Sequence, residues 1–247
     1  MNTLKTARRI FQQFQIFVTA DYSTFIALFS IFAMPLVIWP ILSSILLSSN
    51  LAANKFINAV LSVIVGLCHP FGALSISLCT YAWQKEEKEK IGQFLKSLNS
   101  FFGRVISTYL AQAILLIIPM LILFAIVFVL KILEPVRDIY YPLIIYTIYW
   151  FFYYFAWPLL IIKRISGFRN AIESVKLSSR YAFAVIILLA PFLCWALLFQ
   201  ILASNSDSIA RGILSAIGYI AFLPLSAVQM ITYQNYSSLD ETKLKEN

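Results

Sequence analysis

The sequence predicts an all-α membrane protein that crosses the bilayer several times. Of its 247 residues, 61% are hydrophobic and only 12% are charged, whereas about 25% of the residues of soluble domains carry a charge. Uncharged apolar runs of about twenty residues recur along the chain, and a helix of that length crosses the hydrocarbon core. The short alternating segments of a transmembrane β-barrel do not occur. We therefore expect a single integral membrane domain over residues 1–247.

Six transmembrane spans are predicted, and none of them contains Asp, Glu, Lys or Arg. Their approximate bounds are 25–47, 56–83, 107–130, 140–162, 183–203 and 213–233. The spans pair into three hairpins because the chain between the members of each pair is short. The second span is longer than one crossing requires, so we expect it to tilt or to bend at Pro70.

The distribution of positive residues predicts the orientation of these spans. All but four of the 19 Lys and Arg residues fall on one side, and that side is expected to be cytoplasmic because Lys and Arg resist translocation. The four exceptions are Lys55, Lys131, Arg137 and Arg211. Both termini are therefore expected in the cytoplasm, with the bacterial inner membrane as the compartment. The connections on the other side are too short to form a binding domain, so any function is expected within the bilayer or on its cytoplasmic face.

An amphipathic segment precedes each predicted hairpin, at 1–20, 88–105 and 166–181. Such a helix lies in the membrane interface, with its apolar face at the acyl boundary and its cations among anionic headgroups. The alternative is three ordinary solvated loops, but the apolar stripe of the second segment would be hard to leave in water. The residues predicted at the interface are Arg8, Arg9, Phe11, Phe14, Phe94, Leu95, Leu98, Phe168, Arg169, Ile172, Lys176 and Arg180.

The stretch RNAIESVKLSSRYAFAVIILLAPF, residues 169–192, resembles the recurring element of a bacterial membrane superfamily of largely unknown function. That superfamily includes the YciC-like proteins and the membrane domain of some glycerophosphodiester phosphodiesterases. Its members carry a helix of the form A-x-x-x-S-x-x-L before a span, which Ala171, Ser174 or Ser178, and Leu177 match in part. The resemblance implies six helices with interfacial segments. It implies no catalytic residues, because the phosphodiesterase chemistry belongs to a separate soluble domain.

The stretch GLCHPFG, residues 66–72, contains the only histidine of the chain, His69, followed by Pro70 in the second predicted span. Ionisable side chains inside a membrane are functional hypotheses, and Pro70 leaves a backbone carbonyl one turn earlier without its helical donor. One interpretation is therefore a proton-sensitive or ligand-binding group at a helix bend. The alternative is a neutral histidine that bonds to the freed carbonyl or to a nearby serine, which the lack of an acidic residue in any span favours.

No motif of a nucleotide-binding loop, a metal-binding histidine pair or a Ser–His–Asp set occurs. We therefore expect no catalytic residue, no metal site and no cofactor. The net charge of +8 is explained by the topology and by anionic lipid, so nucleic acid is not an expected partner. The favoured function is a non-enzymatic membrane protein that organises or senses the envelope or scaffolds a protein partner, with cytoplasmic anionic headgroups as its lipid partners. The alternative is a permease-like transporter component for a lipid or other apolar substrate.

Overall fold

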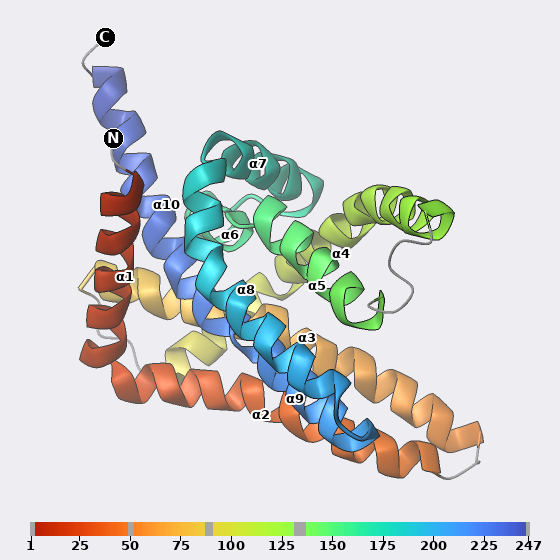
Figure 1. The fold of residues 1–247 in the computed structure, drawn as a ribbon. Helices are drawn as coiled ribbons and strands as arrows, with labels where there is room; N and C mark the ends of the chain where they lie inside the picture. The colour runs from red at the N-terminus through yellow and green to blue at the C-terminus, as the bar shows by residue number, and fades with distance from the viewer. Residues whose placement is uncertain (1–2, 49–51, 87–90, 131–136, 246–247) are drawn as a thin grey trace.

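A computed structural model describes residues 3–48, 52–86, 91–130 and 137–245, and these ranges are helical apart from short connections (Figure 1). The predicted all-α class is therefore confirmed. In chain order the helices are α1 (Thr3–Ala20), α2 (Tyr22–Ser48), α3 (Ala52–Gln84), α4 (Ile91–Leu130), α5 (Arg137–Phe152), α6 (Ala156–Ile162), α7 (Gly167–Arg180), α8 (Ala182–Ser204), α9 (Ser208–Ile220) and α10 (Phe222–Lys245).

Five helical segments of the described chain are long and apolar enough to cross a membrane. They are Tyr22–Leu46, Asn54–Gln84, Lys96–Ile117, Ala182–Ser204 and Ile209–Ser237, the last of which joins α9 and α10. Large apolar side chains stay exposed on the outer faces of these segments, for example Met34, Val63 and Ile186, as a lipid-facing surface requires. The chain is therefore a candidate multi-pass membrane protein, while the predicted sixth span and the orientation in the membrane stay predictions.

The predicted fourth span, 140–162, is divided into two helices. The first, α5, ends at Phe152, and α6 begins at Ala156 after a turn over 153–155. Pro158 stands in the first turn of α6, where its missing N–H costs no helical hydrogen bond. With 16 and 7 residues, each helix is shorter than the hydrocarbon core is thick. Two short helices therefore replace one uninterrupted helix. The turn between them leaves backbone groups without helical hydrogen bonds, and side chains of the next helix, α7, bond to these groups.

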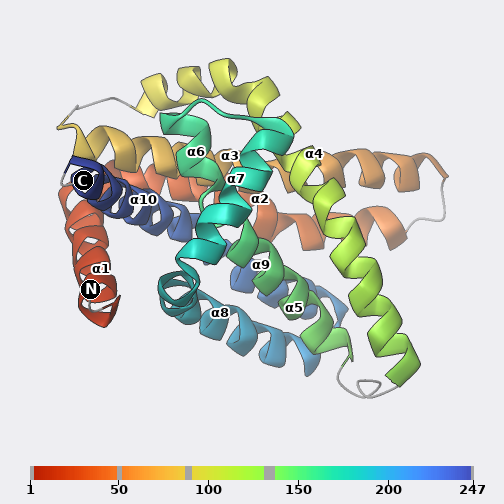
Figure 2. The same ribbon diagram turned by 90° about the horizontal axis from the view of Figure 1, so that it is seen from above.

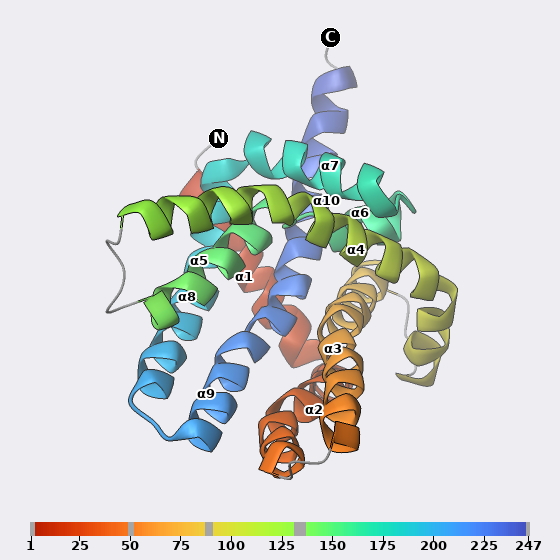
Figure 3. The same ribbon diagram turned by 90° about the vertical axis from the view of Figure 1, so that its right-hand side faces the viewer.

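The second amphipathic segment and the third predicted span belong to one helix. This helix, α4, is continuous over its 40 residues, yet it bends between its first part and its remainder (Figures 2 and 3). Gly103 lies in this helix, and a Cβ atom there would meet nothing within 4 Å. The change from an amphipathic stretch to an apolar one is therefore accompanied by a change of direction rather than by a loop.

Two helix hairpins, α2–α3 and α8–α9, lie side by side (Figures 1 and 3). One glycine marks a close approach within the first hairpin, and another marks a close approach between the two hairpins. A Cβ atom at Gly72 of α3 would be 2.7 Å from Cβ of Phe32 on α2. A Cβ atom at Gly212 of α9 would be 2.7 Å from Cβ of Pro40, also on α2. Membrane helices pack closely where small residues let the backbones approach, so α2 contacts both α3 and α9.

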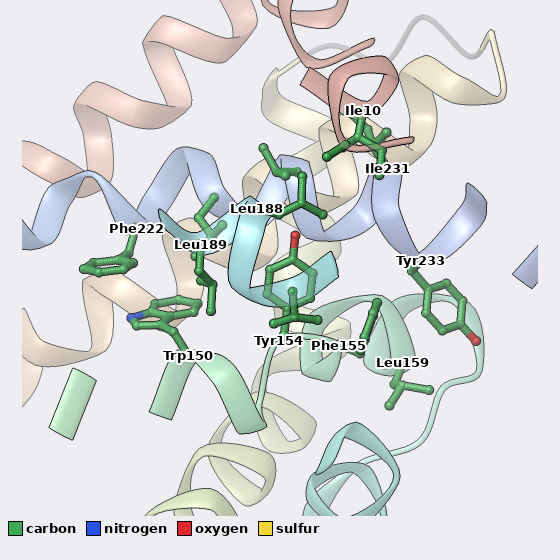
Figure 4. Packing of buried hydrophobic residues seen from close by; sticks show 14 of the residues in the cluster. Ile10, Trp150, Tyr154, Phe155, Leu159, Leu188, Leu189, Phe222, Ile231 and Tyr233 are labelled. Atoms are coloured by element: carbon green, nitrogen blue, oxygen red, sulfur yellow. The ribbon is translucent and has the colours of Figure 1, made fainter. Parts of the chain in front are cut away.

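The main core of the protein forms where α5 and α6 meet α8 and α10 (Figure 4). The ring of Trp150 stacks on that of Phe222 with centroids 5.2 Å apart and an angle of 6° between the planes. Tyr154 is fully buried, and its hydroxyl shares a hydrogen bond of 3.2 Å with that of Thr232. Many of the aromatic residues of the predicted fourth span are therefore packing residues of the core.

The first and last helices also lie side by side (Figure 2). Ala7 and Ile10 of α1 are buried in the main core, and Phe17 is buried between α2, α3 and α10. The side-chain amide of Asn235 on α10 donates to Oε1 of Gln13 at 2.9 Å. The apolar face of α1 therefore packs largely on the protein itself.

Candidate functional site

A cavity of about 540 Å³ lies between α2, α3, α4, α5 and α9. Its size falls within the range of roughly 300–1,000 Å³ that is typical of ligand pockets. Most of the lining side chains are apolar or aromatic, and none of the described lining residues is Asp, Glu, Lys or Arg. The polar or aromatic members include Trp39, His69, Tyr109, Tyr149, Trp150 and Tyr219. The arrangement suits an uncharged, largely apolar molecule.

His69, singled out in the sequence, lines this cavity from α3. Its ring meets that of Trp150 edge-on, with the centroids 5.5 Å apart. The Nε2 atom is buried and has no hydrogen-bond partner among the described residues. Pro70 follows inside α3, which continues through it as a helix. The structure thus places His69 at a cavity, and its role as a ligand-binding group stays a prediction.

Two further polar side chains have unused donors, namely Trp150, which lies against His69, and Gln112, which is bonded to Tyr149. The indole Nε1 of Trp150 is buried and makes no hydrogen bond within the described chain. Gln112 of α4 accepts from the Tyr149 hydroxyl at 2.7 Å, while its own amide Nε2 is buried without a partner among the described residues. The sequence offered one signal for Gln112, a fully polar side chain inside an apolar span, and none for Trp150, because tryptophan is common in membrane helices.

The helix α7 supports the broken segment between α5 and α6. The hydroxyl of Ser174 donates to the carbonyl oxygen of Phe152 at 3.1 Å and accepts from the backbone N–H of Phe155 at 3.1 Å. The hydroxyl of Ser178 donates to the same Phe152 oxygen at 3.2 Å. These bonds take up backbone groups that leave the helical pattern at the turn, and an unpaired buried group would cost about 1–3 kcal/mol.

The start of α7 is held in the same way. The side-chain amide of Asn170 donates to the carbonyl oxygens of Ala156 and Ile165 at 2.9 and 3.0 Å. The backbone N–H of Gly167 donates to the hydroxyl of Thr108 on α4 at 3.0 Å. Gly167 has a φ of +62°, a conformation that glycine adopts without steric cost. Asn170, Ser174 and Ser178 follow one another at intervals of four residues, so they form one polar stripe along the helix.

Seen along its axis, α7 therefore has three faces. Its buried face carries Asn170, Ala171, Ser174 and Ser178. A second face is apolar yet exposed, with Phe168 at 50% and Ile172 at 46% of their full accessibility. A third face carries the exposed charges of Arg169, Lys176 and Arg180 with Glu173 among them. The sequence predicted the second and third faces. It did not predict that the polar stripe is buried, because polar side chains on a surface helix are normally expected to face water.

The other residues predicted at the interface are placed differently. On α1, Arg8 and Arg9 are exposed, whereas Phe11 and Phe14 are half-buried against the protein core. On α4, Leu98 is half-buried against two core clusters. The side chains of Phe94 and Leu95 lie outside the described part of the chain. For all of these residues, contact with lipid stays a prediction.

A basic hollow of about 610 Å³ lies at the turn that leads into α7. Its lining residues are Lys163, Arg164, Ile165, Ser166 and Arg169. The side chains of Lys163, Arg164 and Arg169 are exposed, so the charged face of α7 continues into this hollow. Among the described residues, no three His, Cys, Asp or Glu side chains lie together in a way that could hold a metal ion.

Comparisons of the chain with protein-family models, with curated proteins and with solved structures found no match. The geometry therefore defines a class only, a candidate multi-pass membrane protein with a cavity between its helices and one basic, amphipathic surface helix.

Proposed function

We propose that this chain is a non-enzymatic membrane protein of the bacterial inner membrane that binds anionic lipid headgroups on the cytoplasmic side and so organises or senses the envelope or scaffolds a partner. The observation that supports the proposal most is the three-faced arrangement of α7. One face is packed on the protein, which leaves the apolar face with Phe168 and Ile172 beside the charged face with Arg169 and Lys176. An interfacial helix has this arrangement, with its apolar residues at the acyl boundary and its cations among the headgroups.

The charge of this region supports an anionic partner. Five positive residues occur between the end of α6 and the end of α7, namely Lys163, Arg164, Arg169, Lys176 and Arg180, against the single negative charge of Glu173. Glu173 lies 3.3 Å from Lys176 in an exposed ion pair, and such pairs contribute little. Each cation near an anionic surface contributes about 1 kcal/mol of attraction. The same cations would stand on the cytoplasmic side in the orientation that the positive residues predict.

The test is lipid selection by the full chain in nanodiscs that contain a neutral and an anionic phospholipid. We expect phosphatidylglycerol to be enriched among the lipids that stay bound to the purified protein, as measured by mass spectrometry. The variant Arg169→Gln/Lys176→Gln should lower the affinity for phosphatidylglycerol by about 30-fold, if each lost charge contributes about 1 kcal/mol. The matched control, Lys55→Gln/Arg211→Gln, removes two charges predicted on the other side and should leave cytoplasmic-leaflet binding unchanged. Equal enrichment in both variants would contradict the proposal.

A permease-like component for a lipid or apolar substrate is the second candidate. It is favoured by the cavity of about 540 Å³ beside His69, because a transported molecule needs a site within the membrane. The described chain has no charged side chain at that cavity to couple transport to an ion, so an energy source would have to come from a partner. If an ATPase co-purifies with the chain in stoichiometric amounts in native nanodiscs, the permease-like function is favoured over headgroup binding. The resemblance to the six-helix superfamily stays a prediction, and it does not favour either of the two candidate functions.

A further inference from the structure

Hydrogen-bonding atoms without partners occur at the cavity between α2, α3, α4, α5 and α9, on two of its lining residues and on one residue bonded to its wall. Within the described chain, Nε2 of His69, Nε1 of Trp150 and the amide Nε2 of Gln112 are all buried without partners. His69 and Trp150 line the cavity, and Gln112 is bonded to Tyr149, which also lines it. A buried donor or acceptor without a partner lowers stability unless something bonds to it. A polar group of a bound molecule would remove part of that cost.

These side chains are held in place by neighbours rather than free to turn away. Trp150 stacks on Phe222 of α10 at 5.2 Å (Figure 4). The Tyr149 hydroxyl fixes Oε1 of Gln112 at 2.7 Å, which leaves the two N–H groups of the amide as the unused donors. A site that is already ordered before binding loses less entropy when a ligand arrives. The indole N–H of Trp150 thus stands in a fixed position beside the His69 imidazole, and the amide of Gln112 is fixed by its bond to Tyr149.

The walls of the cavity limit what can bind. None of the described lining residues is Asp, Glu, Lys or Arg, so a charged ligand would be buried without a partner charge, which is too costly. Most of the wall is apolar, so the greater part of the molecule must be apolar as well. Gly66 and Ala113 are exposed where α3 and α4 border the cavity. A molecule from the bilayer would enter there.

We propose that this cavity binds one uncharged amphiphile, an apolar chain or ring system whose single hydroxyl or carbonyl head group accepts hydrogen bonds from Trp150 and Gln112 and bonds to His69. The apolar part occupies the space between α2, α4 and α9. The site is separate from the surface of α7, so its failure and the failure of the proposed headgroup binding are distinguishable.

The probe is a long-chain alcohol that carries a photoreactive diazirine on its chain, added to the full chain in nanodiscs. After irradiation, mass spectrometry maps the labelled residues. We expect labelling of peptides that line the cavity, above all those with Ala113, Leu116 and Tyr149. The same chain without a head group should label these peptides at least fivefold less. The same chain with a carboxylate should also label them at least fivefold less.

Two glycines supply the decisive variant and its control. A Cβ atom at Gly66, on the cavity wall, and one at Gly103, away from it, would each meet nothing within 4 Å. Gly66→Leu therefore adds a bulky side chain at the cavity wall, from a Cβ atom that meets no protein atom, and should lower labelling by the alcohol at least fivefold. Gly103→Leu adds the same side chain to another helix and should leave labelling unchanged. Equal unfolding temperatures of the two variants show that any loss comes from the cavity.

A third variant isolates the head group. Trp150→Phe keeps an aromatic ring against Phe222 but removes the N–H donor, so labelling by the alcohol should fall several-fold while the weaker labelling by the hydrocarbon stays the same. The proposal is overturned if Gly66→Leu labels as strongly as the wild type. It is also overturned if the hydrocarbon or the carboxylate labels the cavity as strongly as the alcohol.

Discussion

Ser174 of α7 bonds to both sides of the break that follows Phe152. Its hydroxyl donates to the Phe152 carbonyl oxygen at 3.1 Å and accepts from the Phe155 N–H at 3.1 Å. In a continuous helix the N–H of Ala156 would reach the Phe152 oxygen, but here it bonds to Tyr153 instead, at 3.1 Å. A polar helix kept between two apolar runs thus replaces the helical bonds that α5 and α6 lose where they part.

The first prediction concerns this hydroxyl. Ser174→Ala leaves the buried N–H of Phe155 without its partner, so we expect a loss of about 1–3 kcal/mol in stability. Ser178→Ala should cost less, because Ser174 still donates to the Phe152 oxygen. Ser179→Ala, at an exposed position of the same helix, is the control and should change nothing. Thermal unfolding of the purified chain in nanodiscs measures all three, and equal melting temperatures for the Ser174 and Ser179 variants would refute the assignment.

The second prediction concerns the close approach of α2 and α3 at Gly72. Gly72→Ala places a Cβ atom 2.7 Å from Cβ of Phe32, which forces α2 and α3 apart. Overpacking of this kind costs about 1–3 kcal/mol. Gly66→Ala, earlier in the same helix α3, is the control, because a Cβ atom there meets no atom within 4 Å. This variant should raise stability by up to about 1 kcal/mol, since alanine favours a helix over glycine. If unfolding measurements show that both variants change stability in the same direction, the close approach at Gly72 is contradicted.

The third prediction concerns the start of α9. The carboxylate of Asp207 accepts from the backbone N–H of Ala210 at 2.8 Å and caps the helix. Asp207→Ala removes that acceptor and should cost about 1 kcal/mol. Asp207→Asn retains an acceptor at the same place and should cost little, which makes it the matched control. Hydrogen exchange at the first turn of α9 measures the effect locally, and unchanged protection in the alanine variant would show that the cap contributes nothing.

The fourth prediction tests the orientation. In a background with Cys68, Cys79 and Cys194 replaced, Ser206→Cys is expected on the outer side and Ser179→Cys on the cytoplasmic side, as the positive residues predict. A membrane-impermeant maleimide added to intact spheroplasts should therefore label the cysteine at position 206 and spare the one at 179. Both should react once the membrane is opened with detergent. The reverse pattern in intact cells would invert the orientation.

Composition and apolar run length were sufficient to predict the all-α class and candidate membrane spans, because the bilayer demands long uncharged helices with satisfied backbones. The sequence likewise pointed to His69 as an unusual residue and to α7 as amphipathic. It did not reveal that Phe11 and Phe14 pack half-buried on protein, since an apolar face looks the same whether lipid or another helix covers it.

By itself, the sequence determined the all-α class and the places where polar residues interrupt its apolar runs. Only the tertiary structure decided what those residues contact. The break after Phe152 could not be foreseen, because it depends on Ser174 and Ser178, which reach the turn only after α7 folds back upon it. The position of the unused Trp150 donor beside His69 was equally hidden. His69 and Trp150 come from α3 and α5, far apart in the chain, and only packing brings them together at one cavity.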